Sequence, residues 1–322
     1  MNESQSPLVT FALFAYNQEK YIAEAVNAAL SQTYTPLQII LSDDASNDAT
    51  YELMCQIVSK YDGHHEIILN KNEKNLGIGA HVNKVMEMAK GEIIVVAAGD
   101  DISDTNRVET VVDSFIKSKE KIYSIWSAAR YIDDAGCSLL RRFPGGLDEF
   151  TEKTMVRNVR PLIGATHAWR REVFDLFGPL MDGVVFEDNA ISFRSYLLGA
   201  IKYLDRELVS YRSHCKNITN FTKVGDFKAL YAGAAKRNAW ALIGIKQRKS
   251  DLEFAIANNL IINRNVLSLH RELMKIEIRT KLRLKCYLQF PLFEFDILLG
   301  SFRDIEILKV LIRSVQCRLI GN

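Results

Sequence analysis

The stretch that most constrains the fold is the segment from Gly91 to Asp101, a short apolar run that ends at two acids. The run Ile93–Ala98 is uniformly apolar and mostly β-branched, which is typical of a strand buried on both faces, as in a parallel sheet. Asp100 and Asp101 follow it after a single glycine. Ligands of open α/β sheets bind beyond the carboxyl ends of the strands, and paired carboxylates suit Mg²⁺ or Mn²⁺ bound to phosphates. An acidic loop that caps the next helix is the alternative for this segment alone.

The chain before this segment alternates between strand-like and helix-like patterns at intervals of about 25 to 30 residues. Residues 8–15, 37–42 and 66–69 have the apolar pattern of strands, and Asn17 is the predicted N-cap of the first helix. This alternation predicts βαβ units, a parallel sheet and right-handed crossovers. The carboxyl ends of three strands would then meet at one edge, lined by Tyr16 and Asn17, Asp43 and Asp44, and Asp100 and Asp101.

The composition and the motifs of the chain exclude several classes of protein. The 322 residues are 48% hydrophobic and 25% charged, as in a soluble globular protein, and no apolar run reaches the roughly 18 residues that span a bilayer. The five scattered cysteines lack zinc or disulfide spacing, and the polar first seven residues do not resemble a signal peptide. The first strand is followed by Tyr-Asn-Gln-Glu instead of GxGxxG, and the sequence has no Walker A motif. We therefore expect a cytoplasmic protein that is neither an oxidoreductase nor a P-loop NTPase.

A further acidic pair lies in the second part of the chain. Residues 184–186 form a short apolar run that places Glu187 and Asp188 at the start of a helical pattern. Acids also favour a helix N-terminus through the helix dipole, which is the structural alternative to a chemical role. Residues 159–169 contain small and aromatic side chains suited to shaping a sugar pocket, and residues 200–212 are typical of strands.

Taken together, these motifs resemble those of the family 2 glycosyltransferases, which have the GT-A fold. The resemblance covers about residues 7–215, and the matching features occur in the order of the family. They are Tyr16-Asn17, Ser31-Gln32-Thr33-Tyr34, Asp43-Asp44-Ala45-Ser46-Asn47-Asp48, Asn75-Leu76-Gly77, Gly91-Glu92-Ile93-Ile94, Gly99-Asp100-Asp101 and Glu187-Asp188. The implied architecture is a Rossmann-like α/β domain of residues 1–222, with a mostly parallel central sheet and flanking helices, followed by a basic helical region of residues 223–322.

The resemblance implies that the donor is a nucleotide-diphosphate sugar of the UDP, GDP or dTDP type. Asp44, preceded by Asp43, is similar to the aspartate that reads the base in this family. Asp100 matches the metal-binding aspartate of the DxD motif and Asp101 follows it, so both are expected to bind the metal, and the implied cofactor is Mg²⁺ or Mn²⁺. The other residues at nucleotide-contacting positions are Ala15, Tyr16, Glu19, Asn75 and Gly77.

The metal motif departs from the family pattern at one position. Ala98 stands where the first aspartate of DxD usually lies, which leaves the contacts to the sugar and the metal affinity open. His214 sits where some members supply a further metal or pyrophosphate contact. A structural histidine at a strand end is the alternative reading of this residue.

The reaction implied by the resemblance is inverting sugar transfer by single displacement, of the hexosyltransferase type. Asp188 matches the general base and Glu187 is the alternative. The acceptor would be a glycan or a lipid-linked saccharide, in the synthesis of an O-antigen-like or capsule-like surface polysaccharide. A non-catalytic nucleotide-sugar-binding or scaffold protein is the second hypothesis, favoured by Ala98 and opposed by the intact Asp100. A nucleotidyltransferase is a third, but it would carry a Gly-rich basic loop after the first strand.

The C-terminal region differs from the rest of the chain in charge and pattern. Residues 1–222 contain 23 Lys and Arg against 30 Asp and Glu, whereas residues 223–322 contain 18 against 9. Helices are predicted over residues 227–249 and 252–276. Basic and apolar residues interleave over 270–293, which predicts either contact with an anionic membrane surface or packing on the catalytic domain. The first reading suits a polyprenol-linked acceptor and a peripheral position at the inner face of the plasma membrane; nucleic-acid binding is not expected.

Overall fold

A nine-stranded sheet organises the described part of the chain in this computed structural model, which comprises residues 6–143, 151–157, 163–214, 227–262, 264–288 and 304–309. The strands follow the order β3-β2-β1-β4-β8-β6-β9-β5, and β7 pairs with β6 outside this path. Their bounds are β1 Val9–Ala15, β2 Leu37–Asp43, β3 Glu66–Lys71, β4 Ile93–Ala98, β5 Ile102–Ser103, β6 Ile122–Ile132, β7 Ser138–Phe143, β8 His167–Arg170 and β9 Ala200–Arg212.

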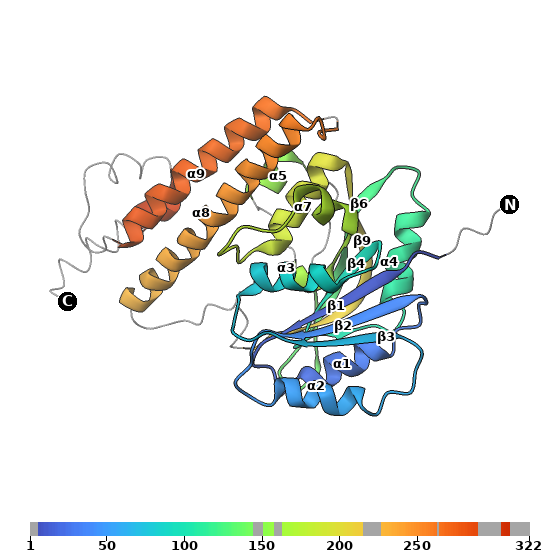
Figure 1. The fold of residues 1–322 in the computed structure, drawn as a ribbon. Helices are drawn as coiled ribbons and strands as arrows, with labels where there is room; N and C mark the ends of the chain where they lie inside the picture. Colours follow the sequence, from blue (N-terminus) through green and yellow to red (C-terminus); the bar gives the residue numbers. More distant parts are fainter. Residues whose placement is uncertain are drawn as a thin grey trace.

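Helices cover both faces of this sheet (Figure 1). Side chains of α1, α2 and α4 pack against one face, and side chains of α3, α6 and α7 pack against the other. Because successive residues of a strand point to opposite faces, Phe11 joins the first core and Ala12 the second. The helix bounds are α1 Ile22–Leu30, α2 Thr50–Val58, α3 Ile78–Met88, α4 Arg107–Ile116, α5 Glu152–Arg157, α6 Arg171–Phe177, α7 Glu187–Leu198, α8 Phe227–Ala257 and α9 Val266–Leu288.

The predicted parallel βαβ arrangement is confirmed for the first four strands. β1 pairs in parallel with both β2 and β4, and β2 pairs in parallel with β3. In this register Ala15 lies opposite Asp43, and Phe14 lies opposite Ala98, so that the three strands end side by side. The backbone ladder continues one residue past each end, where Asp44 donates its amide to the Ala15 carbonyl at 2.9 Å. The polar residues that follow these strands therefore share one edge, as the alternation predicts.

The start of β4 depends on a close approach between two backbones. The Gly91 amide donates to the Thr10 hydroxyl at 2.9 Å. A Cβ atom on Gly91 would lie 2.2 Å from the Thr10 backbone nitrogen, which is far inside van der Waals contact. Only glycine fits there without displacing β1, so this residue fixes how β4 enters the sheet.

The second half of the sheet is mixed in direction. β8 runs antiparallel to both of its neighbours, β4 and β6, while β6 and β9 run parallel to each other. β5 and β7 also run against the main direction, which β1, β2, β3, β4, β6 and β9 share. The carboxyl end of β9 thereby returns to the edge where β1, β2 and β4 end, because Ile102 of β5 pairs with Ser210.

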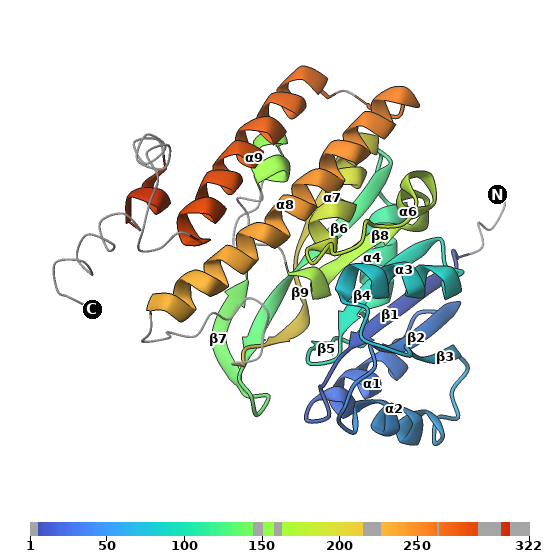
Figure 2. The ribbon, with the colours of Figure 1, turned by 60° about the vertical axis from the view of Figure 1, so that its left-hand side comes forward.

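The C-terminal helices form a second layer over α7 (Figure 2). Buried side chains from α5, α7, α8 and α9 make one apolar cluster, in which Leu252 of α8 and Leu273 of α9 are fully enclosed. The predicted break at residues 250–251 is wrong, because α8 continues to Ala257; Asn259, two residues after its end, is in the left-handed conformation with φ 53°. Residues 289–293 of the predicted membrane-contacting segment lie outside the described residues. None of the described helices is long and apolar enough to cross a lipid bilayer.

Candidate functional site

The loops after β1 and β2 are joined by hydrogen bonds between side chains and backbone. Residues 15–19 and 43–49 form the resulting surface, which we call the shelf. The Asn17 amide donates to the Ser46 hydroxyl at 2.8 Å, and the Asn17 side-chain oxygen accepts the Asn47 amide at 2.9 Å. Glu19 makes a similar exchange, because its carboxylate accepts the Ala49 amide at 3.1 Å. Asn17 is left-handed at φ 53° and α1 begins only at Ile22, so the predicted N-cap role is wrong. Asn adopts this conformation more readily than most residues, and here it locks two loops together.

Asp44 holds the turn at residues 75–77 against the end of β2. One carboxylate oxygen accepts the Leu76 amide at 2.9 Å and the Asn72 side-chain amide at 2.8 Å, and the other accepts the Gly77 amide at 3.0 Å. Asp44 is buried, whereas Asn75 and Gly77 are exposed on the outer side of this turn. The predicted base-reading residue and the predicted turn residues are thus brought together.

The remaining residues predicted to contact the nucleotide line the same shelf in different roles. Asp43 is fully buried and accepts both the amide and the hydroxyl of Ser46, so it closes the loop after β2. Ala15 contributes its carbonyl to the strand ladder, and Tyr16 is 43% exposed at the rim. The shelf therefore offers an exposed aromatic ring beside a rigid turn, which suits a flat ring such as a base.

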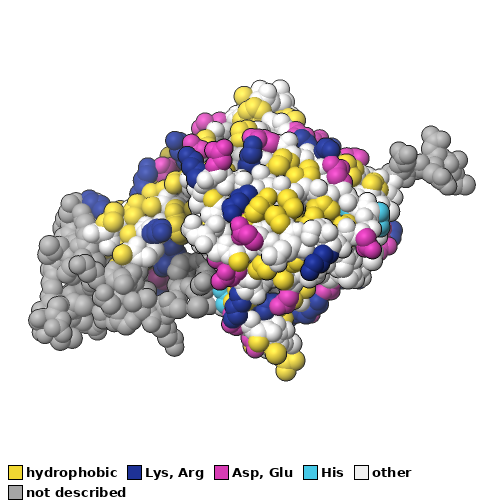
Figure 3. Space-filling model, turned by 60° about the horizontal axis from the view of Figure 1, so that its bottom comes forward, with side chains coloured by type: hydrophobic (Ala, Val, Ile, Leu, Met, Phe, Trp, Pro, Cys, Tyr) yellow, Lys and Arg dark blue, Asp and Glu magenta, His cyan; other side chains and the backbone are white. Residues whose placement is uncertain are grey.

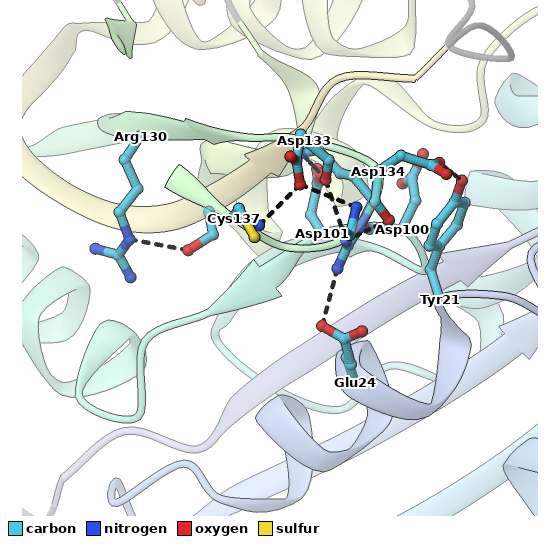
Figure 4. Close-up of polar contacts among 11 residues, drawn as sticks. Tyr21, Glu24, Asp100, Asp101, Arg130, Asp133, Asp134 and Cys137 are labelled. Atoms are coloured by element: carbon cyan, nitrogen blue, oxygen red, sulfur yellow. Dashed lines mark hydrogen bonds and ion pairs between the residues drawn. The ribbon is translucent and has the colours of Figure 1, made fainter. Parts of the chain in front are cut away.

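Asp100 and His214 face each other at the neighbouring strand ends. Asp100 Oδ2 lies 2.9 Å from His214 Nε2, although the two residues are 114 positions apart. The His214 ring stacks on the Tyr21 ring, with centroids 5.0 Å apart. The Tyr21 hydroxyl donates to Asp134, which lies in the turn between β6 and β7 (Figure 4). The structure thus brings together Asp100 and His214, the two residues that the sequence placed at the candidate metal site.

The buried guanidinium of Arg212 holds this region together. Its Nε donates to the Asp100 carbonyl at 3.0 Å, and its Nη1 donates to the carbonyls of Asp133 and Asp134, each at 3.2 Å. Its Nη2 pairs with the Glu24 carboxylate of α1 at 2.9 Å. The sequence alone did not reveal this role of Arg212, since basic residues near the acids are as consistent with a contact to phosphate or acceptor, or with charge balance, as with a structural anchor. Its position next to His214, at the end of a strand that returns to the site, was the available signal.

Asp101 turns into the protein, away from its neighbour. Its Oδ1 accepts the Arg212 backbone amide at 2.8 Å, and only 4% of the residue is exposed. Burial, together with the charge of Asp100, raises the pKa of the Asp101 carboxyl well above its usual range. Asp101 thus anchors β9 to the turn after β4.

The donor set at Asp100 and His214 fits a divalent cation in part. A carboxylate oxygen and an imidazole nitrogen 2.9 Å apart have about the spacing of two neighbouring ligands on an octahedral ion. Mixed oxygen and nitrogen ligands of this kind suit Mn²⁺. Among the described residues no cluster of three or more His, Cys, Asp or Glu side chains could hold a metal ion. Further ligands would have to come from a bound diphosphate and water, which is how Mg²⁺-type sites at phosphates are commonly completed.

Glu187 and Asp188 form the first turn of α7. Burial raises the pKa of Asp188 to about 6, and burial with the charge of Asp188 raises the pKa of Glu187 well above its usual range. Both carboxyls lie against Gly164, where an added Cβ would be 3.4 Å from Glu187 Oε1 and 3.5 Å from Asp188 Oδ2. The next residue, Ala165, packs in a cluster with Ala98 at the end of β4. The acids therefore border the same sheet edge as the turn after β4.

Arg194, which lies on the same helix as these acids, pairs with other groups. Arg194 pairs with Asp251 of α8 at 3.0 Å and donates to the Gly178 carbonyl at 2.7 Å. It thus ties α7 to α8. Glu187 and Asp188 keep their raised pKa values without a cation from Arg194.

Comparison with known proteins shows which family the chain resembles. Residues 10–177, just over half of the chain, match Glycosyl transferase family 2. A chondroitin synthase of Escherichia coli is 32% identical over 130 residues, which cover 40% of this chain and 18% of that protein. The glycosyltransferase GlyG of Streptococcus pneumoniae is 26% identical over 226 residues, which cover 66% of this chain and 73% of that protein. The chain spans only 18%, 50% and 51% of the chondroitin synthase and two other curated relatives.

Solved structures with the same fold extend over most of the chain. The S. aureus protein TarS in complex with UDP matches with a TM-score of 0.54 and 17% identity, covering 91% of this chain and 74% of TarS. A mannosyltransferase from Pyrobaculum calidifontis, in complex with GDP-Man and Mn²⁺, matches with a TM-score of 0.57 and 14% identity, covering 98% and 81%. At these identities the likeness shows the fold, which is GT-A with C-terminal helices, as predicted.

The hydrogen bonds of Asp44 predict a measurable loss of stability on its replacement. In Asp44→Asn one of the two acceptor oxygens becomes an NH₂ donor, which would face either the Gly77 amide or the Leu76 amide and the Asn72 side chain, so that buried donors are left unsatisfied. We expect the free energy of unfolding to fall by about 1–3 kcal/mol. Urea denaturation checks this, with Asp62→Asn as the control, because Asp62 is exposed in the loop after α2. Equal stability of the two variants would show that Asp44 does not hold the turn.

Proposed function

Because the chain belongs to glycosyl transferase family 2, we propose that it transfers a sugar, with inversion, from a nucleotide-diphosphate sugar to a saccharide acceptor. The setting proposed is the synthesis of a cell-surface polysaccharide, with a glycan or lipid-linked saccharide as acceptor. The observation that carries the proposal is the Asp188 carboxyl at the sheet edge, whose pKa of about 6 suits a base at neutral pH. In domain terms, residues 1–222 would form the catalytic unit and residues 223–322 the basic helical region.

The donor would lie across the ends of β1, β2 and β4. The heterocyclic base of the nucleotide would bind near Tyr16, against the joined loops after β1 and β2. The turn at residues 75–77 would face this heterocyclic base. Ala15, Glu19, Asp43 and Asp44 would shape this site, largely by holding its loops in place. Support comes from TarS, whose structures contain UDP or UDP-GlcNAc, and from the mannosyltransferase with GDP-Man.

Asp100 and His214 are the proposed protein ligands of a divalent cation. Asp101 was expected to be a third ligand, but its Oδ1 accepts the Arg212 amide. We therefore propose that Asp101 stabilises the turn that carries Asp100. The mannosyltransferase structure, which has the same fold, contains GDP-Man and Mn²⁺, which supports a divalent ion as cofactor in general. When bound, such an ion neutralises charge that develops on the departing diphosphate.

Asp188 is the proposed general base. Above pH 6 its carboxylate would accept the proton of the acceptor hydroxyl while that oxygen forms its bond to the anomeric carbon. The bond from the anomeric carbon to the diphosphate breaks in the same step, and the diphosphate leaves with the electron pair. The charge of Asp188 raises the pKa of Glu187, whereas Glu187 is not among the causes of the raised pKa of Asp188, so Asp188 would be the first of the two to ionise. This order of ionisation favours Asp188 over Glu187 as the base.

Nucleotide binding is expected to depend on Asp100 and on metal. Calorimetric titration with UDP, GDP and dTDP, each with and without Mn²⁺, should show one nucleotide that binds more tightly with the ion. In Asp100→Asn and His214→Gln this gain should fall at least tenfold, because each variant removes one proposed ligand. Asp113→Asn, at an exposed ion pair on α4, is the control.

Two outcomes of this titration would contradict the proposal. Binding that is indifferent to Mn²⁺ and to Asp100 would remove the metal assignment. If no nucleotide binds at all, the alternative of a protein without catalytic activity, which Ala98 in place of the first DxD acid favours, would replace the transferase.

The rate of donor turnover is expected to follow the ionisation of Asp188. A base with a pKa of about 6 is active only when deprotonated, so kcat/KM should be level above pH 7 and fall about tenfold per pH unit below about pH 6. Asp188→Asn should lower kcat by about 10²–10⁴ and abolish this acid limb. Glu187→Gln is the matched control, and it should keep the limb near pH 6. A limb that disappears in Glu187→Gln but persists in Asp188→Asn would reverse the assignment.

We further propose that α9 contacts an anionic membrane surface, as a lipid-linked acceptor would require. Leu267, Met274 and Ile278 are exposed at 76%, 48% and 57% on one face, opposite the side that packs on the protein. On the underside of the molecule as drawn in Figure 1, which Figure 3 brings forward, apolar side chains also lie beside Lys and Arg on the described part of the arm formed by α8 and α9. The protein should float with vesicles that contain phosphatidylglycerol, and Met274→Glu with Ile278→Glu should reduce this. Absence of wild-type flotation would contradict a membrane contact.

A further inference from the structure

A basic cleft lies between α8 and α9, beside the start of α7, and the chemistry described above does not use it. Its volume is about 370 Å³, within the range of about 300–1,000 Å³ that is usual for ligand sites. Four of its described lining residues are cationic and none is acidic; the cations are Arg248, Lys275, Arg279 and Arg283. A concave site with this charge fits an anion.

The spacing of residues along the two helices builds this cleft. Lys275, Arg279 and Arg283 follow one another at intervals of four, which places them on one face of α9. On the facing side of α8 the lining residues include the small Ala241 and Gly244. A Cβ atom added to Gly244 would have no neighbour within 4 Å, so there is open space at this point.

Three of the four cations already have partners. Arg283 is held by the Asp304 carboxylate at 2.7 and 3.0 Å, and Lys275 pairs with Glu272 at 2.8 Å. Arg248 is buried and donates to the carbonyls of residues 155 and 156. Arg279 is exposed to the cleft, and its guanidinium makes no hydrogen bond or ion pair with the described residues. Among the described residues, therefore, the Arg279 guanidinium has no hydrogen-bond or ion-pair partner, and the three neighbouring cations are held in place by theirs.

The position of the cleft relates it to the proposed base. Phe186, Asn189 and Ala190 form part of its wall, and they flank Glu187 and Asp188 directly in sequence. The donor site at the strand ends lies on the sheet, whereas the cleft is formed by the helical layer. A molecule held in the cleft would thus lie beside the first turn of α7, which carries Asp188.

We propose that the cleft binds an anionic group of the acceptor, a phosphate or a carboxylate carried by its saccharide, with Arg279 as the principal contact. The fork of a guanidinium matches two oxygens of either group, and a charge-assisted pair of this kind is stronger than a neutral one. The naming of the ligand as the acceptor rests on the proposed transferase function; the binding of an anionic sugar does not. A membrane surface is the less favoured occupant, because a flat surface contacts the outer face of α9 and does not enter a cleft between two helices.

The test is calorimetric titration of the full chain with three sugars that differ in charge: glucose 1-phosphate, glucuronate and glucose. The chain is first saturated with Mn²⁺ and its best-binding nucleotide, so that the donor site is filled. One or both anionic sugars should bind at least tenfold more tightly than glucose, and the tighter one names the anion. Arg279→Gln should weaken that binding about tenfold. Arg271→Gln, an equal loss of charge at an exposed position of α9 outside the cleft, should leave it within about twofold.

Several results would overturn the inference. Equal affinity for glucose and for the anionic sugars would remove the anion site, and equal losses in Arg279→Gln and Arg271→Gln would show general electrostatic attraction. A further contrary result is that no sugar binds while both variants lose binding to phosphatidylcholine vesicles with about a quarter phosphatidylglycerol, since this would assign the charges to a membrane. The sugar titrations can also be run on the chain alone. Failure of nucleotide binding would then count against the transferase function, and failure of anion binding against the cleft.

Discussion

The buried ion pair and hydrogen bonds of Arg212 are the interactions on which the site depends. One guanidinium joins the turn after β4, the turn between β6 and β7, and helix α1, which lie far apart in the sequence. Removing a charged group from water is costly, and here the cost is offset by three carbonyl groups and the Glu24 carboxylate. Since the Asp100 backbone is fixed by Arg212, its side chain is left to face His214. The same arginine lies over the Tyr21 ring, with the guanidinium carbon 4.9 Å from the centroid, and that ring stacks on His214. The orientation of both proposed metal ligands therefore depends on Arg212.

The two pairs of adjacent acids, Asp100 with Asp101 and Glu187 with Asp188, each contain carboxyls in different environments. At the end of β4, Asp101 is enclosed and bonded to the Arg212 amide, whereas Asp100 meets a histidine. At the start of α7, burial raises the pKa of both carboxyls, and the charge of Asp188 raises the pKa of Glu187 further. In both pairs the two carboxyls thus differ in their surroundings, and the proposed chemistry uses Asp100 in one pair and Asp188 in the other. Two carboxylates with different pKa values are the usual means of obtaining an acid and a base from one residue type.

Strands and helices that depend on a local pattern could be predicted from the sequence. Strand pairings and side-chain contacts between distant segments could not. The apolar runs at residues 8–15, 37–42 and 93–98 predicted β1, β2 and β4, and their parallel order followed from the helices between them. The insertion of β8 antiparallel between β4 and β6 could not be predicted, because no local signal fixes which strands pair. Asn17 was taken for a helix cap, although it bonds to a loop 30 residues away. The pairing of Arg212 with Glu24 spans 188 residues and is visible only in the folded chain.

The opposite charges of the two parts of the chain match the different chemistry of the two proposed substrates. A donor diphosphate held through a cation needs acidic ligands, and a base that accepts a proton must also be an acid residue; both lie within residues 1–222. An anionic acceptor needs direct cationic contacts, and these lie on α8 and α9. If the cations stood beside Asp188 they would stabilise its charged form and lower its pKa, which would weaken it as a base. The raised pKa of Asp188 arises from burial alone, with no cation among its causes. Placing the cations on a separate helical layer allows the acceptor to be attracted without that loss of basicity.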